Sequence, residues 1–466
     1  MGLKKDISFY FIGNVASKAI AFILVPIYVA SMSQAEYGIV GSMQVLINAL
    51  AIFLSLGTER SIYRLYHDYK DEKEKKEFLG TISVFIYIFG ALSLVMMFLF
   101  REQISLIYKS IPFAPYYMFA MLIAYVSVFE IVPSIYLQVA QKSKQYLIIS
   151  LIKLVVSSGF ILYYTVYLKQ EAVGMLKGML FGHIATLPIY FGIQYKNFSF
   201  VFKKKYLVPT LKYSLPLLPS LLSAWVINLS SQIFIEHNFS TSEVAIYALS
   251  LKIVALVTII SSAIMTAYNP TFYKLANGED QAYAKLTLYK VQNNIIVFFI
   301  ICISLIGIFS KDIIVHFFSA DYENAMIIIP ILVFGNIATQ MSGFLNLAFY
   351  QSKKTKQIMW MMLSSAIVTI ALNAYLIPLY SIVGAAITYL ISSVVLFCFQ
   401  YNLAKKYYFI DYNWKKILLV MLVMVLLCSL NYFILPATWS WTIIKLLIIS
   451  FPMYFFLRKF INDLSI

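Results

Sequence analysis

The sequence predicts an all-α, polytopic membrane protein with about fourteen transmembrane helices, and three observations support this prediction. Of its 466 residues, 61% are hydrophobic and only 12% are charged, and the mean hydropathy is +0.82. Soluble globular chains are nearer half apolar and a quarter charged. The apolar residues fall in runs long enough to cross a bilayer, which takes about 20 residues. Finally, the basic residues gather in alternate loops between these runs.

The apolar runs predict the spans in chain order. Residues 8–30 form an apolar stretch that is too long for a signal peptide and lacks a clear small-residue cleavage site, so we interpret it as the first span. The last run is short, and twelve spans with a re-entrant pair is the alternative count. The predicted spans are about 8–30, 37–57, 79–100, 116–140, 146–168, 174–193, 214–235, 245–268, 291–309, 326–350, 358–377, 383–401, 417–435 and 443–457.

The basic residues predict the orientation of the chain. If the N-terminus is cytoplasmic, 27 of the 36 Lys and Arg residues fall on the cytoplasmic side, 4 fall in the opposite loops, and 5 lie within or at the ends of spans. Cytoplasmic loops of membrane proteins carry such an excess. A miscount of one span would reverse the pattern downstream of it. We therefore predict an even number of spans with both termini in the cytoplasm.

Composition also excludes several function classes. The loops are too short to fold as a catalytic ectodomain, a nucleotide-binding domain or a nucleic-acid-binding module, and the net charge of +16 is explained by orientation. Cys302, Cys398 and Cys428 lie in apolar runs without metal or disulfide spacing. The four histidines lie on separate segments. We therefore expect no metal site, no bound cofactor and no enzymatic activity. We expect the functional site to lie between the helices.

Short repeated motifs predict two related halves. They lie at equivalent places in the topology, at offsets of 207 to 210 residues. Each half has six spans and starts on the cytoplasmic side, so the repeat is parallel, an arrangement of transporters that bind substrate near the midplane between two lobes. The motif pairs are Ser33-Gln-Ala-Glu36-Tyr-Gly with Ser240-Thr-Ser-Glu243-Val-Ala, Gln141-Lys-Ser-Lys-Gln145 with Gln351-Ser-Lys-Lys-Thr-Lys-Gln357, and Val173-Gly174 with Val383-Gly384.

The repeat divides the chain into four parts. We predict an N-lobe of spans 1–6 in residues 1–195, and a C-lobe of spans 7–12 in residues 214–402. Residues 403–466 would be an appended helix pair. The linker at 196–213 is basic and aromatic enough to lie along an anionic inner leaflet.

Ionisable residues inside the spans are the first candidates for a binding site. They cost about 2.5–3.5 kcal/mol each on insertion scales, so they mark function by default. Lys18, Lys153 and Glu130 lie at similar depths of ~12–15 Å at 1.5 Å per residue. Glu130 and Lys153 are on consecutive spans, where they form either a structural ion pair or part of a cationic site. Lys252 either reaches the interface or faces the cavity as a C-lobe cation.

Polar and aromatic side chains complete the predicted site. Trp225, Asn228 and Gln232 fall on one helical face of span 7, where they can bind sugar hydroxyls or form hydrogen bonds between helices. Arg60 and Arg64 follow span 2 at the cytoplasmic mouth. Their guanidinium groups suit phosphate, although ordinary positive-inside placement also explains them.

Several segments resemble one transporter family. The chain is similar to the Wzx-type polysaccharide (O-antigen or capsule) flippases of the multidrug/oligosaccharidyl-lipid/polysaccharide exporter superfamily. One departure is the Gln232-Ile233 pair, where family members often carry an acidic and a basic residue late in span 7. The similar segments are YSLPLLPSLLSAWVINLSSQIFI at 213–235, SEVAIYALSLKIV at 242–254, LNAYLIPLYSIVGAAITYLIS at 372–392 and GTERSIYRLY at 57–66.

The resemblance implies a fold and a function. It implies two six-helix lobes in a MATE-like V shape, alternating access, and a bacterial inner (plasma) membrane location. The implied cargo is an undecaprenyl-diphosphate-linked oligosaccharide unit, flipped from the cytoplasmic to the periplasmic leaflet, with polysaccharide polymerase machinery as a partner. Sodium, protons or membrane potential would drive it. The alternatives are a lipid II flippase for peptidoglycan synthesis and a cation-coupled multidrug exporter, with a membrane glycosyltransferase or polymerase as the enzyme alternative.

Overall fold

The computed structural model describes residues 19–448, and in this part the helices are joined by turns and short irregular segments. The side chains of residues 259, 260, 263, 266, 267 and 270 are not described. The main helices up to residue 238 are α2 (Val25–Ala30), α3 (Gln34–Ser55), α4 (Thr58–Leu65), α5 (Glu72–Leu99), α6 (Arg101–Ser105), α7 (Met118–Val139), α8 (Ser143–Leu162), α9 (Glu171–Asn197), α10 (Lys204–Ser214), α11 (Leu218–Leu229) and α12 (Ser231–Asn238). They are followed by α13 (Thr241–Ala276), α14 (Gln281–Ile308), α15 (Ser310–Phe317), α16 (Ala325–Gln351), α17 (Thr355–Ala404) and α18 (Trp414–Phe433).

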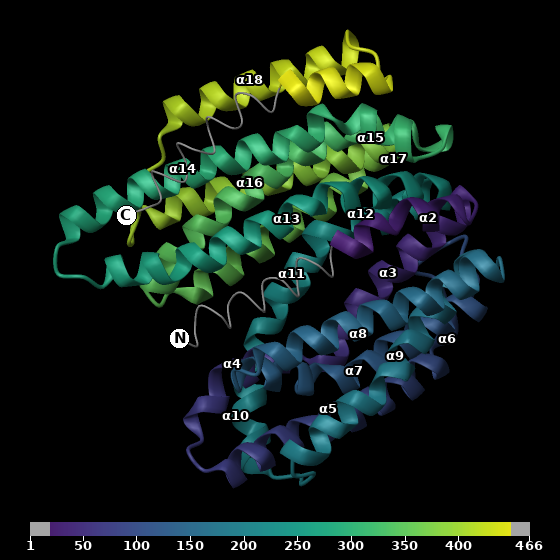
Figure 1. The fold of residues 1–466 in the computed structure, drawn as a ribbon. Helices are drawn as coiled ribbons and strands as arrows, with labels where there is room; N and C mark the ends of the chain where they lie inside the picture. Colours follow the sequence, from purple (N-terminus) through teal and green to yellow (C-terminus); the bar gives the residue numbers. More distant parts are fainter. Residues whose placement is uncertain (1–18, 449–466) are drawn as a thin grey trace. The chain divides into compact units, whose positions relative to one another are not determined.

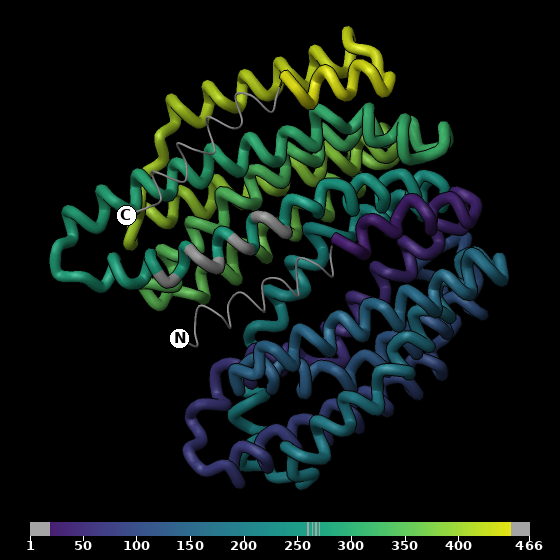
Figure 2. The backbone as a smooth tube through the Cα atoms, in the orientation of Figure 1, coloured from purple at the N-terminus to yellow at the C-terminus, as the bar shows by residue number. Residues whose placement is uncertain are grey.

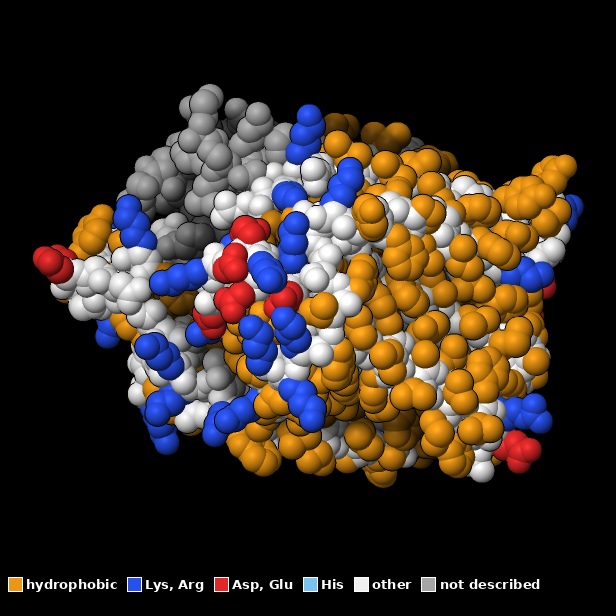
Figure 3. All heavy atoms as spheres, turned by 90° about the horizontal axis from the view of Figure 1, so that it is seen from below, with side chains coloured by type: hydrophobic (Ala, Val, Ile, Leu, Met, Phe, Trp, Pro, Cys, Tyr) orange, Lys and Arg blue, Asp and Glu red, His pale blue; other side chains and the backbone are white. Residues whose placement is uncertain are grey.

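Within the described residues the predicted spans coincide with helices, while residues 8–18 of the first predicted span and 449–457 of the last lie outside the described part. Ten helices of the described range are long and apolar enough to cross a membrane, and the bent run from α10 to α12 makes eleven if it counts as one span. The 50-residue α17 covers two predicted spans, because its backbone breaks at Ser381, where φ is 49°. Shorter apolar helices at Ala19–Ala30 and Trp439–Ile448 lie in the region of the first and last predicted spans. On the face drawn in Figure 3, hydrophobic side chains form a broad band and charged side chains gather mainly at one end.

The chain forms two compact units, Met1–Ala248 and Leu249–Ile466. In the first unit α7 packs against α3, α5 and α9, and α8 packs against α9, so that these helices run side by side (Figure 1, Figure 2). The helices α10 and α11 belong to this unit because they pack on α4, α5 and α3. In the second unit α16 packs between α14 and α17, and α18 packs on α14. The lobes expected at 1–195 and 214–402 stay a prediction.

Two of the repeated motifs begin helices in the same way. The Ser33 side chain accepts a hydrogen bond from the Glu36 amide at 3.3 Å at the start of α3. At the start of α13, Ser240 accepts one from the Glu243 amide, also at 3.3 Å. A Ser followed three residues later by Glu is the sequence of a capping box. The short sequence match therefore corresponds to one local structure used twice.

The second motif pair ends helices with matching turns. Gln141 after α7 and Lys353 after α16 both adopt positive φ, 54° and 56°. The next residue in each turn donates its amide to a carbonyl five residues earlier, at 2.8 Å in both cases. This is the hydrogen bond of a Schellman motif, which closes a helix C-terminus.

The glycines of the third pair lie against backbone carbonyls. A Cβ on Gly174 would lie 2.7 Å from the Tyr164 carbonyl oxygen, and one on Gly384 would lie 2.3 Å from that of Leu376. At either position, any residue other than glycine would bring its Cβ too close to the carbonyl oxygen. All three motif pairs thus recur as local structure in the two halves of the sequence.

A glycine repeat brings α8 and α9 into close contact. Gly174, Gly178 and Gly182 follow one another at four-residue spacing and therefore share one face of α9. A Cβ on Gly178 would lie 2.5 Å from the Ile161 Cα, and one on Gly182 would lie 2.7 Å from the Ser157 Cα. Small residues at this spacing let membrane helices approach until their backbones touch.

A proline inside α7 ties that helix to its neighbours. Pro133 has no amide hydrogen, so the carbonyl of Phe129, four residues earlier, lacks its usual helical partner. The Gln194 side chain on α9 donates to this carbonyl at 3.1 Å, and the Tyr87 hydroxyl on α5 lies 3.5 Å from it. Polar side chains therefore satisfy the backbone group that the proline leaves free.

In the second unit, an ion pair holds the C-terminal segment to α15. Lys445 lies 2.9 Å from the Asp312 carboxylate, and both residues are buried. The Thr442 hydroxyl also donates to Asp312, and Lys445 donates to the Pro436 carbonyl at 3.1 Å. The cost of burying the two charges is offset by their mutual attraction and by these extra hydrogen bonds.

Candidate functional site

A cluster of ionisable residues lies inside the first unit, on three adjacent helices. Glu130 of α7 is 5% exposed. Its carboxylate pairs with the Lys153 ammonium of α8 and lies 3.0 Å from Nδ1 of His183 on α9. The Thr186 hydroxyl, one turn beyond His183, donates to the same carboxylate at 3.2 Å. The predicted neighbours Glu130 and Lys153 are thus in contact, with two further partners.

Helical spacing and the glycine repeat explain why these side chains meet. On α8, Tyr146, Ser150, Lys153 and Ser157 follow at i, i+4, i+7 and i+11, which places them on one face. His183 directly follows Gly182, at the point where α9 touches α8. The close approach of the two helices brings a polar face of α8 opposite the histidine.

The same residues line a cavity of about 430 Å³. Its wall is rich in hydroxyl groups, and 32% of the Lys153 side chain is exposed although its ammonium contacts Glu130. The lining residues are Ser134, Tyr146, Ser150, Lys153, Leu154, Ser157, Ile161, Met179, His183 and Tyr190.

The cluster can bind an anion through its lysine. With Lys153 charged, Glu130 ionised and His183 neutral, its net charge is zero, and Nδ1–H of His183 can donate to the carboxylate. An anion that enters the cavity would compete with Glu130 for the Lys153 ammonium. Neighbouring hydroxyls could donate to the same anion. Phosphate and sugar groups are the ligands that such a wall can hold.

The predicted polar face of span 7 lies mainly against α3. The Trp225 indole donates to the Val45 carbonyl at 3.1 Å. Gln232 is 4% exposed, and its amide oxygen has no hydrogen-bond partner among the described residues. Asn228 is exposed and donates to the Ala224 carbonyl of its own helix at 2.7 Å. None of the three lines the cavity beside Lys153.

The remaining predicted residues lie elsewhere. Arg60 and Arg64 are exposed on the short helix α4, where Arg64 pairs with Asp68 at 2.8 Å. Lys252 is half-buried on α13, in the second unit. Lys18 falls outside the described residues. The structure therefore brings together Lys153 and Glu130 of the predicted set, and their roles stay predictions.

Sequence reasoning missed two functional candidates. His183 was set aside because the histidines are scattered along the chain, yet it adjoins the third glycine of a helix-contact repeat. The predicted span 7 ends at residue 235 and leaves out Glu236, whereas the structure shows Glu236 in the last turn of α12 as a buried carboxylate. It lies one helical turn after Gln232.

Comparison with known sequences gives three matches. A family described as polysaccharide biosynthesis protein matches residues 3–276, more than half of the chain. The "Lsg locus putative protein 1" of Haemophilus influenzae is 23% identical over 285 residues, which cover 59% of this chain and 67% of the relative. An uncharacterised membrane protein of the same organism is 23% identical over 292 residues, which cover 60% and 67%.

Several solved structures share the fold. The lipid II flippase MurJ, in an inward closed conformation, superposes with a TM-score of 0.75 at 15% identity, covering 98% of this chain and 99% of MurJ. An inward-facing multidrug resistance transporter of the MATE family and MOP superfamily has a TM-score of 0.62 at 15% identity, covering 92% and 96%. A mutant of the Vibrio cholerae MATE transporter VcmN has a TM-score of 0.60 at 14% identity, covering 87% and 96%. These likenesses show the fold.

Proposed function

The chain belongs to the family of polysaccharide biosynthesis proteins, and on this premise we propose that it flips an undecaprenyl-diphosphate-linked oligosaccharide unit across a bacterial inner membrane. It is a multi-pass membrane protein with the fold of the flippases and exporters of the MOP superfamily. The direction is from the cytoplasmic to the outer leaflet, by alternating access. The product would feed surface polysaccharide synthesis by polymerase machinery.

The Glu130–Lys153–His183–Thr186 cluster beside a hydroxyl-lined cavity is the observation that carries the substrate assignment. A lysine within a membrane span is costly, and its contact with Glu130 offsets that cost when no substrate is bound. We infer that the diphosphate replaces Glu130 as the partner of Lys153, while serines and tyrosines of the wall bind sugar hydroxyls. Lys18 and Lys252 are proposed as further cations, and Arg60 and Arg64 as the first phosphate contacts at the cytoplasmic mouth.

Flipping of a fluorescent polyprenyl-diphosphate-linked oligosaccharide in proteoliposomes tests this proposal. A membrane-impermeant quencher reports the fraction of substrate in each leaflet. We expect the wild type to flip the substrate and Lys153→Gln to reduce the rate by about tenfold or more, as the loss of one charge-assisted hydrogen bond predicts. Lys177→Gln is the matched control, because this lysine of α9 donates to Gln170 at 2.9 Å and does not line the cavity.

Three results would contradict the proposal. Equal rates for Lys153→Gln and Lys177→Gln would remove the cavity from the transport path. Export of cationic dyes without any flipping of the lipid-linked saccharide would indicate a multidrug exporter instead. A preference for lipid II over other lipid-linked saccharides would indicate the peptidoglycan precursor as cargo.

A further inference from the structure

A short strap joins α6 to α7 at the end of the first unit that the charge pattern predicts to be external. The strap comprises residues 106–112, and its anchor is Tyr108, which is 1% exposed. The Tyr108 hydroxyl donates to the Ser42 carbonyl of α3 at 2.8 Å, and its amide donates to the Tyr117 hydroxyl at 3.0 Å. Burial raises the pKa of the Tyr108 phenol well above its ordinary value, so this donor stays protonated. The strap is thus fixed to α3 and to the start of α7.

One carboxylate holds the other side of the strap. Glu236, near the end of α12, accepts hydrogen bonds from the Lys109 amide at 2.9 Å, the Ser110 amide at 2.7 Å and the Ser110 hydroxyl at 2.5 Å. It is 2% exposed. These three bonds connect α12 to a strap that is itself held by α3 and α7.

Glu236 is buried and is held by hydrogen bonds alone in the described part of the chain. No Lys, Arg or His of the described range forms an ion pair with it. Burial of a carboxylate without a cationic partner is unfavourable, and the three donors offset part of that cost. If α12 moves away from the strap, water replaces the donors. The three hydrogen bonds therefore hold the strap only while α12 lies against it, which is what a latch requires.

The helices beside this contact are packed without space for larger side chains. A Cβ on Gly38 of α3 would lie 1.6 Å from the Thr241 carbonyl oxygen, at the start of α13. One turn along, a Cβ on Gly41 would lie 3.3 Å from the Gln232 side-chain oxygen of α12. The seam between α3 and α12–α13 is therefore closed next to the strap.

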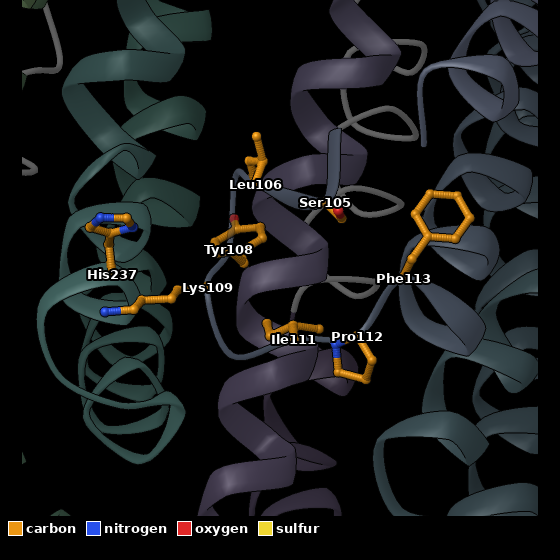
Figure 4. Close-up of a pocket in the computed structure, with 8 residues that line it drawn as sticks. All are labelled: Ser105, Leu106, Tyr108, Lys109, Ile111, Pro112, Phe113 and His237. Atoms are coloured by element: carbon orange, nitrogen blue, oxygen red, sulfur yellow. The ribbon is translucent and has the colours of Figure 1, made fainter. Parts of the chain in front are cut away.

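Space for water adjoins the strap. A cavity of about 420 Å³ lies between the strap and α12, and Figure 4 shows Lys109 extending from the strap toward the helix that carries His237. At about 30 Å³ per molecule, this volume has room for on the order of ten waters. Glu236 does not line this cavity, but its neighbours Lys109 and His237 do, so water can lie close to Glu236.

We propose that Glu236 is a latch that keeps this end of the first unit closed, and that the protein opens outward only when Glu236 releases the strap. The proposal rests on the alternating access of the proposed function, and it adds the residue that sets the closed state. Glu236 is a positioning residue, because it acts on the helices and not on the substrate.

Thiol labelling measures the closed state without any transport assay. Cys302, Cys398 and Cys428 are replaced by alanine, and Gln232→Cys places a reporter in the seam. The protein is reconstituted in proteoliposomes and treated from the outside with a membrane-impermeant maleimide. We expect Glu236→Gln to raise the labelling rate about tenfold or more, since its amide cannot accept from the strap donors as a carboxylate does. Ser110→Ala, which keeps both amide bonds, should give an intermediate rate.

Glu102→Gln is the matched control, because it removes the same charge from an exposed position on α6 next to the strap. Size-exclusion profiles establish that each variant is folded. Equal labelling of Glu236→Gln and Glu102→Gln would overturn the latch, and so would a wild-type seam labelled as fast as the unfolded protein. Faster labelling of Glu236→Gln in a protein that flips no lipid-linked saccharide would support the latch while contradicting the proposed function.

Discussion

A shared carboxylate explains how Lys153 can lie within the membrane-spanning part of the chain. Glu130 contacts Lys153, His183 and Thr186 at once, so it keeps two partners when one leaves. A carboxylate with a single cation would be left unpaired by any anion that captured that cation. His183 and Thr186 therefore lower the free-energy cost when the Lys153 ammonium leaves Glu130 to bind a substrate.

This arrangement predicts different outcomes for single and double replacements. Lys153→Gln should lower the free energy of unfolding by less than the about 3–5 kcal/mol of a fully broken buried pair, because His183 and Thr186 remain. In the double variant Glu130→Gln with Lys153→Gln, expression and thermal stability should recover, because no charge stays buried. Flipping should stay low if Lys153 binds substrate. Recovery of flipping together with stability would mean that the pair is structural.

The proline inside α7 predicts that a second substitution can restore stability lost by a first one. Gln194→Leu should leave the Phe129 carbonyl without its strong donor and lower the free energy of unfolding by about 1–3 kcal/mol. Adding Pro133→Ala returns an amide hydrogen four residues after Phe129, so the double variant should regain stability. Thermal unfolding followed by tryptophan fluorescence measures both. A double variant less stable than Gln194→Leu alone would contradict this account.

At the scale of elements, the contact between α8 and α9 depends on glycine. Alanine normally stabilises a helix relative to glycine by about 0.5–1 kcal/mol. At Gly159 and Gly192 a Cβ would meet no atom within 4 Å, so alanine should raise the melting temperature. At Gly178 the Cβ would meet backbone 2.5 Å away, so alanine should lower it and separate the helices. The same sign of effect at all three positions would contradict the packing.

The elements were predictable because membrane spans follow from local composition. An apolar run of sufficient length becomes a helix wherever it lies, since its backbone groups must be satisfied internally. The capping and turn motifs were equally local, and they recur in both halves of the sequence. Contacts such as His183 with Glu130 depend instead on how close two helices approach, which the glycine repeat on α9 sets.

The candidate site was predictable only in part for the same reason. Depth in the membrane placed Glu130 and Lys153 at compatible levels, and they are paired. The face of span 7 was identified by its spacing, but its partner helix was not, and Trp225 is bonded to α3. Glu236 lies just beyond the apolar run that predicts span 7, so local composition gave no sign that its side chain is buried. Its carboxylate is buried because it accepts hydrogen bonds from three donors on the strap, which lies more than 120 residues earlier in the sequence.

For the whole molecule, the distribution of basic residues predicts the orientation in the membrane. Basic residues are retained on the cytoplasmic side during insertion, and 27 of the 36 fall on one side of the predicted spans. The pattern holds through every predicted loop, so no single loop determines it. The predicted orientation places the strap and Glu236 on the external side, and Arg60 and Arg64 on the cytoplasmic side.

Reporter fusions test this orientation at two distant points. Alkaline phosphatase is active only outside the cytoplasm, and green fluorescent protein fluoresces only inside it. Fusions after Ser319, between α15 and α16, should give phosphatase activity, and fusions after Lys204, at the start of α10, should give fluorescence. An odd number of spans between the two sites is required, and the predicted spans 7, 8 and 9 supply it. Because one missing or extra span would invert everything beyond it, the opposite result at either site would invalidate the span count, the cytoplasmic termini and the external position of the latch together.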